Sequence, residues 1–107
     1  MKLFIDTSNN LKTVIKLGDS QLVKTYSSPR DQNVLSAIDQ LLNQQHKSLT
    51  DITQIEVNPG PGHFTSLRVG IAIANVLSYA LKIPVNGQKP PLIPHYGQPP
   101  NITRTKT

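Results

Sequence analysis

The segment from Thr65 to Lys82 constrains the fold most, because it is a helix pattern that is apolar on two sides. At about 100° per residue its polar residues form one narrow stripe, made of Arg68, Asn75, Tyr79 and Lys82. A helix that covers one sheet face needs an apolar arc of little more than about 100°, and this arc is roughly twice as wide. One flank therefore packs on a sheet, and the other needs a helix or another chain as its partner.

The two flanks of this segment can be listed separately. One holds Leu67, Ile71, Ala74 and Leu81, and the other holds Val69, Ile73, Val76 and Ala80. Small side chains at Gly70 and Ala74 would let a neighbouring helix approach closely.

A first helix is expected from Pro29 to about Lys47. Ser28 is the expected N-cap and Pro29 suits the first helical position. Apolar residues recur at helical spacing, namely Val34, Leu35, Ile38, Leu41 and Leu42. The tetrapeptide Ser48-Leu49-Thr50-Asp51 resembles a capping box over a short turn.

Short alternating runs predict five strands around the two helices: Lys2–Asp6, Leu11–Leu17, Gln21–Ser27, Gln54–Asn58 and Pro84-Val85-Asn86. The order is then βββαβαβ, an α/β fold with a mixed five-stranded sheet. With right-handed crossovers, this topology resembles the single ribonuclease-H-like lobe of the actin, sugar-kinase and Hsp70 architecture.

Composition divides the chain into a body, residues 1–87, and a Pro-rich tail, residues 88–107, expected to be flexible. The net charge of +5 includes three unbalanced tail cations, so the body carries only a small basic excess and no basic stripe. We therefore do not expect the body to bind nucleic acid directly. No cysteine is present, no apolar run reaches membrane-spanning length, and we expect a cytoplasmic protein.

The loop Asn58-Pro59-Gly60-Pro61-Gly62-His63 joins a strand to a helix, a position that often binds anions. Its two prolines remove amide donors, and a plain turn with Thr65 as N-cap is the competing interpretation. The residues of this region that could meet a ligand are Asp6, Thr7, Gly60, Gly62, Thr65 and Arg68.

Two carboxylates, Asp6 and Glu56, lie on strands that could be neighbours and could bind Mg²⁺ in a nuclease. Such a site needs further carboxylates, and an Asx turn at Asp6 and a solvated strand end at Glu56 are the simpler interpretations. The three histidines lack zinc-type spacing. We predict no catalytic residue and no metal site.

Four motifs together resemble one family. The run Pro59-Gly60-Pro61-Gly62-His63-Phe64-Thr65-Ser66-Leu67-Arg68-Val69-Gly70 is similar to the G-P-G-S-F-T-G-L-R-I-G signature of the TsaB (YeaZ) family. Phe4-Ile5-Asp6-Thr7-Ser8 resembles its amino-terminal I-D-T-S, Leu49-Thr50-Asp51-Ile52 its L-x-D-L/I turn, and Lys82-Ile83-Pro84-Val85 its G-I-P-V. The resemblance covers residues 1–87 and not the family's second lobe.

The resemblance implies a non-catalytic subunit, related to TsaD (Gcp-like), in the synthesis of threonylcarbamoyladenosine at position 37 of tRNA. It implies a TsaD-like catalytic partner and a TsaE-like ATPase, and contact with tRNA only indirectly. It also implies that this chain alone holds no cofactor and that ATP or Mg²⁺ is bound in the assembled complex. The family's heterodimer packs helix pairs against each other. The expected interface residues are Val34, Leu35, Ile38, Leu42, Val69, Gly70, Ile73 and Val76.

Two alternatives stay open. One is the Mg²⁺-dependent, ribonuclease-H-like nuclease that uses Asp6 and Glu56. The other is a stand-alone homodimer that buries the same helices.

Overall fold

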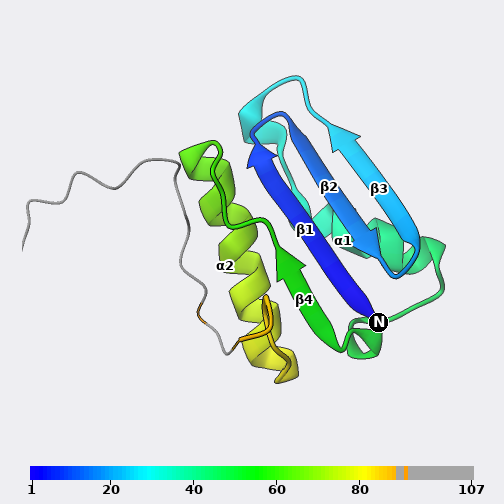
Figure 1. Ribbon diagram of the computed structural model, residues 1–107. Coiled ribbons are helices and arrows are strands. Elements are labelled where there is room, and N and C mark those ends of the chain that lie inside the picture. Colours follow the sequence, from blue (N-terminus) through cyan, green and yellow to red (C-terminus); the bar gives the residue numbers. More distant parts are fainter. Residues whose placement is uncertain (89–90, 92–107) are drawn as a thin grey trace, which may run out of the picture.

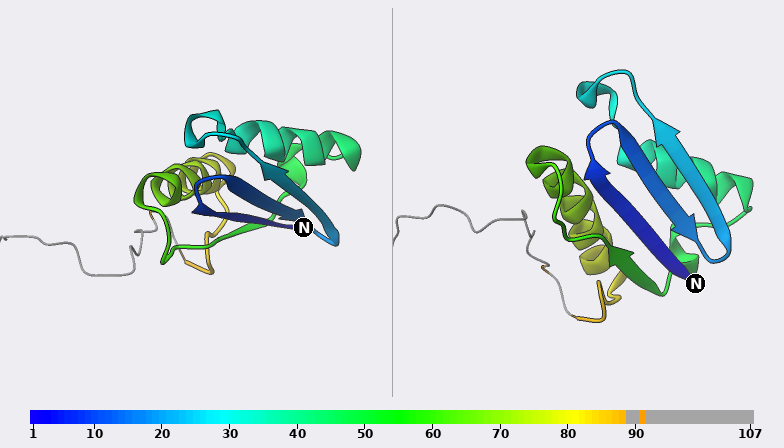
Figure 2. Two further views of the ribbon diagram at one scale, coloured as in Figure 1. Left: turned by 90° about the horizontal axis from the view of Figure 1, so that it is seen from above. Right: turned by 45° about the horizontal axis from the view of Figure 1, so that its top comes forward.

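In the part of the chain that the structure describes, a four-stranded sheet has both helices on one of its faces (Figures 1 and 2). The structure is a computed structural model that describes residues 1–88 and 91. In chain order its elements are β1 (Lys2–Asn9), β2 (Lys12–Leu17), β3 (Ser20–Thr25), a 3-10 turn η1 (Pro29–Asp31), α1 (Val34–Gln44), a 3-10 turn η2 (Leu49–Asp51), β4 (Gln54–Val57) and α2 (Phe64–Leu81).

The sheet is mixed, in the order β3-β2-β1-β4. The first three strands form the expected antiparallel meander, with Ile5 opposite Ile15 and Ile15 opposite Leu22. After α1 the chain returns as β4, which lies parallel to β1 with Ile5 opposite Val57. The mixed α/β topology is confirmed, and β1 ends at Asn9, three residues later than expected, because its turn-forming residues still pair with β2.

The fifth strand predicted at Pro84-Val85-Asn86 is wrong in the described residues. Val85 makes one isolated parallel bridge to Ile55, and the chain then reverses so that Val85 also pairs with Gln88. Asn86 and Gly87 have φ angles of 50° and 75°, the left-handed conformation of a two-residue Asn-Gly hairpin turn. An Asn-Gly pair is a strong turn signal, and it ends the strand after one residue.

The first helix is shorter than predicted. Pro29–Asp31 forms a separate 3-10 turn, and α1 begins only at Val34. The physical reason is a better cap: the Asn33 side-chain oxygen accepts a hydrogen bond from the Ser36 backbone N–H at 3.0 Å. The expected capping box is confirmed, since the Asp51 carboxylate accepts from the Ser48 N–H at 2.8 Å.

α2 begins and ends within one residue of the predicted bounds, with His63 and not Thr65 as its N-cap residue. Its Leu67, Ile71 and Ala74 side chains are buried against the sheet. The flank that holds Val69, Ile73 and Val76 faces outward, with Ile73 half-buried.

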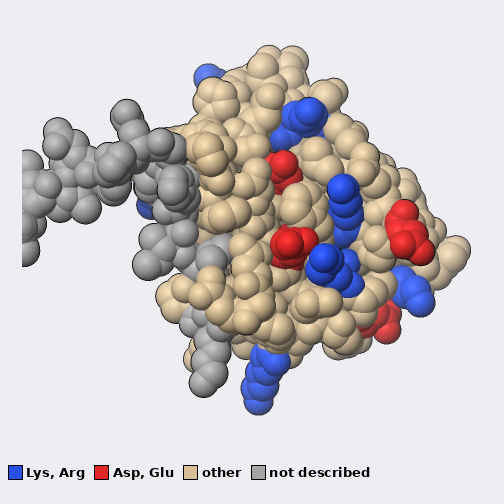
Figure 3. Space-filling model, in the orientation of Figure 1, with Lys and Arg blue, Asp and Glu red and all other residues tan. Residues whose placement is uncertain are grey.

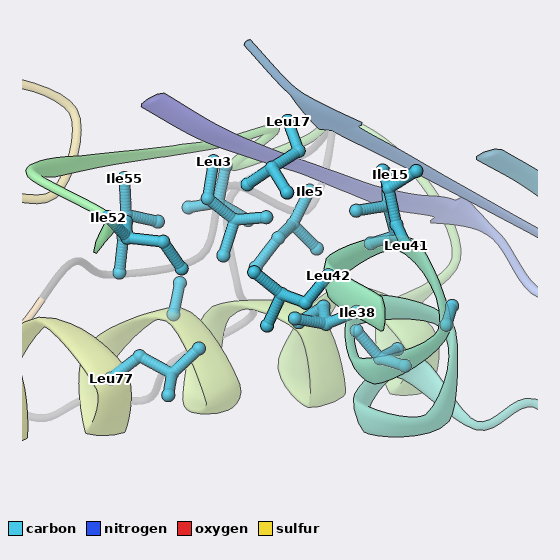
Figure 4. Packing of buried hydrophobic residues seen from close by; sticks show 14 of the residues in the cluster. Leu3, Ile5, Ile15, Leu17, Ile38, Leu41, Leu42, Ile52, Ile55 and Leu77 are labelled. Atoms are coloured by element: carbon cyan, nitrogen blue, oxygen red, sulfur yellow. The ribbon is translucent and has the colours of Figure 1, made fainter. Parts of the chain in front are cut away.

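The hydrophobic core fills the space between the sheet and the two helices (Figure 4). Strand residues of one face point down into it, and apolar residues of α1 and α2 point up. Its members labelled in that view are Leu3, Ile5, Ile15, Leu17, Ile38, Leu41, Leu42, Ile52, Ile55 and Leu77. The predicted tail lies, apart from Gln88 and Pro91, outside the described residues.

Candidate functional site

The loop between β4 and α2 is anchored to the end of β1. The Asn58 N–H donates to the Ile5 carbonyl at 2.9 Å, and the His63 N–H donates to the Ser8 carbonyl at 2.9 Å. A Cβ atom on Gly62 would lie 2.7 Å from the Ser8 carbonyl oxygen, so only glycine fits there. Gly60 has a φ of 116°, which also favours glycine. The two glycines thus let the loop lie directly on β1.

The Asp6 carboxylate helps to hold the loop against β1. Its Oδ1 accepts hydrogen bonds from the Ser8 N–H at 2.9 Å, the Ser8 hydroxyl at 2.7 Å and the Asn58 side-chain amide at 3.2 Å. The first of these is the Asx turn expected at a strand end. The carboxylate therefore has a structural role that ties β1 to the loop.

Thr7 and Gly70 form the closest contact between β1 and α2. Thr7 is fully buried and its hydroxyl donates to the Ser66 carbonyl oxygen at 2.7 Å. A Cβ atom on Gly70 would lie 2.2 Å from the Thr7 hydroxyl oxygen. Gly70 is thus needed for packing within the chain, and neither residue has surface for a partner or ligand.

Asp6 and Glu56 lie on neighbouring strands, because Phe4 pairs with Glu56 across the parallel β1–β4 register. Glu56 is in an exposed ion pair with Lys2, 3.1 Å between Nζ and Oε1. Within residues 1–88 and 91, no three His, Asp or Glu side chains gather as a metal site. The observed arrangement therefore lacks the further carboxylates that a Mg²⁺-dependent nuclease needs.

A hollow of about 570 Å³ lies at the start of α2 between the helix and the η1 turn. It is lined by Arg30, Gln32, His63, Thr65 and Val69, among others. Arg68 lies outside this lining, and its guanidinium stacks over the Phe64 ring at 5.5 Å. Thr65 thus faces this hollow, whereas Arg68 lies along the outer surface.

The eight residues expected at a partner interface divide into two sets. Val34, Ile38, Leu42 and Gly70 are buried within the chain and offer no surface to a partner. Leu35, Val69 and Val76 are 57%, 39% and 65% exposed, and Ile73 is half-buried beside them. We call the second set, with Ala72, the outer helix face.

The outer helix face contains an apolar groove between α1 and α2, about 220 Å³ in volume. Its lining consists of Leu35, Ala72, Ile73, Val76 and Leu77. Tyr79 continues the same side of α2 with 80% of its surface exposed. Ala72 and Tyr79 were not among the expected interface residues, although their helical spacing from Val76 would have placed them there.

The opposite face of the sheet has a different character. Figure 3, drawn from that side, shows lysine or arginine side chains interspersed with acidic ones. Phe4 lies in this face, with the Lys16 ammonium 5.3 Å from its ring centroid. Because charges of both signs are mixed on this face, it does not have the basic stripe of a nucleic-acid-binding surface.

α2 is long and apolar enough to cross a membrane by length and composition, with a mean hydropathy of 1.4. One third of the segment is buried inside the domain. Its inner residues complete the core, as the apolar helices of globular domains do. The excess apolarity is concentrated on the outer helix face.

Comparison with known proteins identifies the wider family. A sequence model of the family described as "TsaD: tRNA N6-adenosine threonylcarbamoyltransferase" matches residues 26–87, more than half of the chain. The tRNA threonylcarbamoyladenosine biosynthesis protein TsaB of Bacillus subtilis is 31% identical over 78% of this chain, and that of Escherichia coli K12 is 33% identical over 79%. In both cases the chain spans 38% of the relative's length.

Solved structures agree with these relatives. YeaZ from Pseudomonas aeruginosa superposes with a TM-score of 0.65 at 28% identity, over 78% of this chain and 42% of that one. The matching part fits a lobe of the actin-like, ribonuclease-H-like architecture. Sequence and structure together show that the chain belongs to the TsaB/YeaZ family and corresponds to less than half of the length of those relatives.

Proposed function

We propose that this chain is a non-catalytic docking lobe that binds a TsaD-like catalytic subunit and supports threonylcarbamoyl transfer to adenosine 37 of tRNA. The relatives named TsaB act in tRNA threonylcarbamoyladenosine biosynthesis. In this proposal the assembled complex also contains a TsaE-like ATPase and binds ATP or Mg²⁺, whereas this chain alone binds no cofactor. We place this role in the cytoplasm.

The observation that carries this proposal is the outer helix face. Leu35 and Val76 are large exposed apolar side chains that line an apolar groove, and Val69 is a further exposed apolar side chain on α2. Contiguous apolar surface on a folded domain marks an interaction site. Neighbouring Tyr79 is the kind of amphipathic residue that is enriched at interfaces.

The family relationship supports a TsaD-like protein as the partner. The TsaD family model matches this chain over α1, β4 and α2. A TsaD-type chain therefore has a lobe of the same kind, with a corresponding helix pair. Two similar helix pairs can pack face to face around a pseudo-twofold axis, so that each covers the other's apolar groove.

A docking role also agrees with the state of the polar residues. Asp6 and Thr7 are engaged in holding the loop and α2, and Glu56 pairs with Lys2. These side chains stabilise the lobe.

The direct test is the affinity of Val76→Asp for the TsaD-like protein of the same organism. A charge placed in the lining of the groove must be desolvated on binding, so we expect Kd to rise roughly a hundredfold. Isothermal titration calorimetry measures this change, and the thermal midpoint of the free variant confirms that it is folded.

Val23→Asp is the matched control, since Val23 is also an exposed valine but lies on β3. Its Kd should equal that of the unmodified chain. Equal affinities for Val76→Asp and the unmodified chain would refute the docking surface. A second copy of this chain bound at the groove, without affinity for the TsaD-like protein, would favour the stand-alone homodimer instead.

A further inference from the structure

The outer edge of β4 is closed by two residues that follow α2. The Ile55 N–H donates to the Pro84 carbonyl at 3.0 Å, and the Ile55 carbonyl accepts from the Asn86 N–H at 2.8 Å. These are main-chain bonds of the kind that a neighbouring strand makes. They satisfy the main-chain groups of one β4 edge residue, Ile55.

Val57 is the next residue of β4 whose main-chain N–H and C=O point to this edge, and both are bonded by a side chain. Its N–H donates to the Asn86 side-chain oxygen at 2.8 Å, and its carbonyl accepts from the Asn86 side-chain NH₂ at 2.9 Å. A primary amide carries the same donor and acceptor as a peptide group. The Asn86 side chain therefore occupies the place of the peptide group that a fifth strand would supply.

The backbone at Asn86 explains why a side chain is needed. With a φ of 50° it begins the turn to Gln88, so the main chain leaves β4 immediately after Val85. Without the side chain, the buried Val57 would have an unpaired N–H and C=O at an open strand edge. Unpaired main-chain groups at a strand edge cost free energy when they are buried away from water, and they can pair with other chains when they are exposed.

Val57 is also the last residue before the family's loop signature. Asn58 follows it directly and bonds to Ile5 and Asp6 from the inner side. Asn86 holds Val57 from the outer side. The base of the loop is thus fixed on both sides.

We propose that the side-chain amide of Asn86 replaces a fifth strand, closing the β4 edge and fixing the base of the Asn58–His63 loop. This inference is independent of the docking proposal. It rests on the four hydrogen bonds that Asn86 and Pro84 make to β4 and on those of Asn58 to Ile5 and Asp6.

The test compares Asn86→Gly with Lys82→Gly by amide hydrogen exchange. Both residues have left-handed backbones, with φ of 50° and 59°, so glycine relieves the same conformational strain in each. Only Asn86→Gly removes the amide. We expect exchange at the Val57 N–H to accelerate roughly tenfold relative to Ile55 in Asn86→Gly, because one hydrogen bond is lost locally. Lys82→Gly should leave that ratio unchanged.

Asn86→Asp keeps the shape of the side chain and covers the case in which the glycine variant unfolds. Its carboxylate can still accept from the Val57 N–H but no longer donates to the Val57 carbonyl. We expect slower Val57 exchange in this variant than in Asn86→Gly. An unchanged Val57-to-Ile55 exchange ratio in Asn86→Gly would overturn the proposal. If that variant does not fold, an unchanged ratio in Asn86→Asp would overturn it.

Discussion

The two apolar faces of α2 contain similar residues but have different surroundings. The inner face, with Leu67, Ile71 and Ala74, is sealed against β1 and β4, whereas the outer face leaves Val69 and Val76 in contact with solvent. Burial of the inner face stabilises the lobe. The outer face contributes little to the stability of the isolated lobe, and its apolar surface contributes binding free energy when a partner covers it. A helix sequence alone gives both faces the same appearance.

Leu67→Ala and Val76→Ala should separate the two faces most clearly. Leu67 is fully buried, so its truncation leaves a cavity and should lower the free energy of unfolding by about 2–5 kcal/mol. Val76 is largely exposed, and its truncation should change that free energy by less than about 0.5 kcal/mol. Urea denaturation measures both, and similar losses for the two variants would contradict the division into inner and outer faces.

Gly70→Ala tests the closest point of the inner face. The new methyl group would overlap the Thr7 hydroxyl, so we expect a loss of about 1–3 kcal/mol despite the better helix propensity of alanine. Thr7→Ala removes the clashing atoms but also the hydrogen bond to Ser66. The double variant should therefore lose less stability than the sum of the single variants, and strict additivity would show that the two residues do not touch.

Lys82→Gly should stabilise the lobe slightly. This position is the C-cap of α2 and belongs to neither apolar face. Lys82 has a φ of 59° at the helix C-cap, where glycine avoids the left-handed penalty. After the entropy of the added glycine is subtracted, we expect a net gain of about 0.5 kcal/mol. Differential scanning calorimetry would register this as a higher Tm. A lower Tm would mean that the Lys82 side chain contributes a contact of its own.

The smallest effect concerns Asp51, which lies on neither face of α2. The hydrogen bond from the Ser48 N–H lowers the pKa of this carboxyl below its ordinary value of 3.8. Its stabilising contribution is therefore complete above about pH 4 and is lost as the pH falls through the folded-state pKa. Asp51→Asn should flatten the acid limb of stability against pH only slightly, because the group is exposed. An acid limb that the substitution leaves entirely unchanged would show that Asp51 does not contribute to it.

The sequence predicted the parts of the fold that depend on local patterns. Alternation placed β1 to β4, and the width of the apolar arc predicted that α2 has an inner and an outer flank. The strand predicted at Pro84–Asn86 is wrong because Asn86-Gly87 is also a turn sequence, and the turn ends the strand pairing after Val85. The cap at Asn33 and that at Ser28 are indistinguishable in sequence, and only the bond to Ser36 selects the former.

The candidate site was predicted less well, for a physical reason. Val34, Ile38 and Leu42 follow one another at a spacing of four, and such a stripe is first of all the face that packs on the sheet. Gly70 has its role through Thr7, a contact across 63 positions of sequence that no local pattern contains. Leu35 stands apart from the stripe on α1, and this offset was the signal for an exposed position.

The most direct test of the docking claim is the mass of the protein in solution, measured by light scattering alone and after mixing with the TsaD-like protein of the same organism. Docking through the outer helix face predicts a one-to-one complex whose mass is the sum of the two chains. Two species that keep their separate masses at concentrations well above the micromolar range would contradict it.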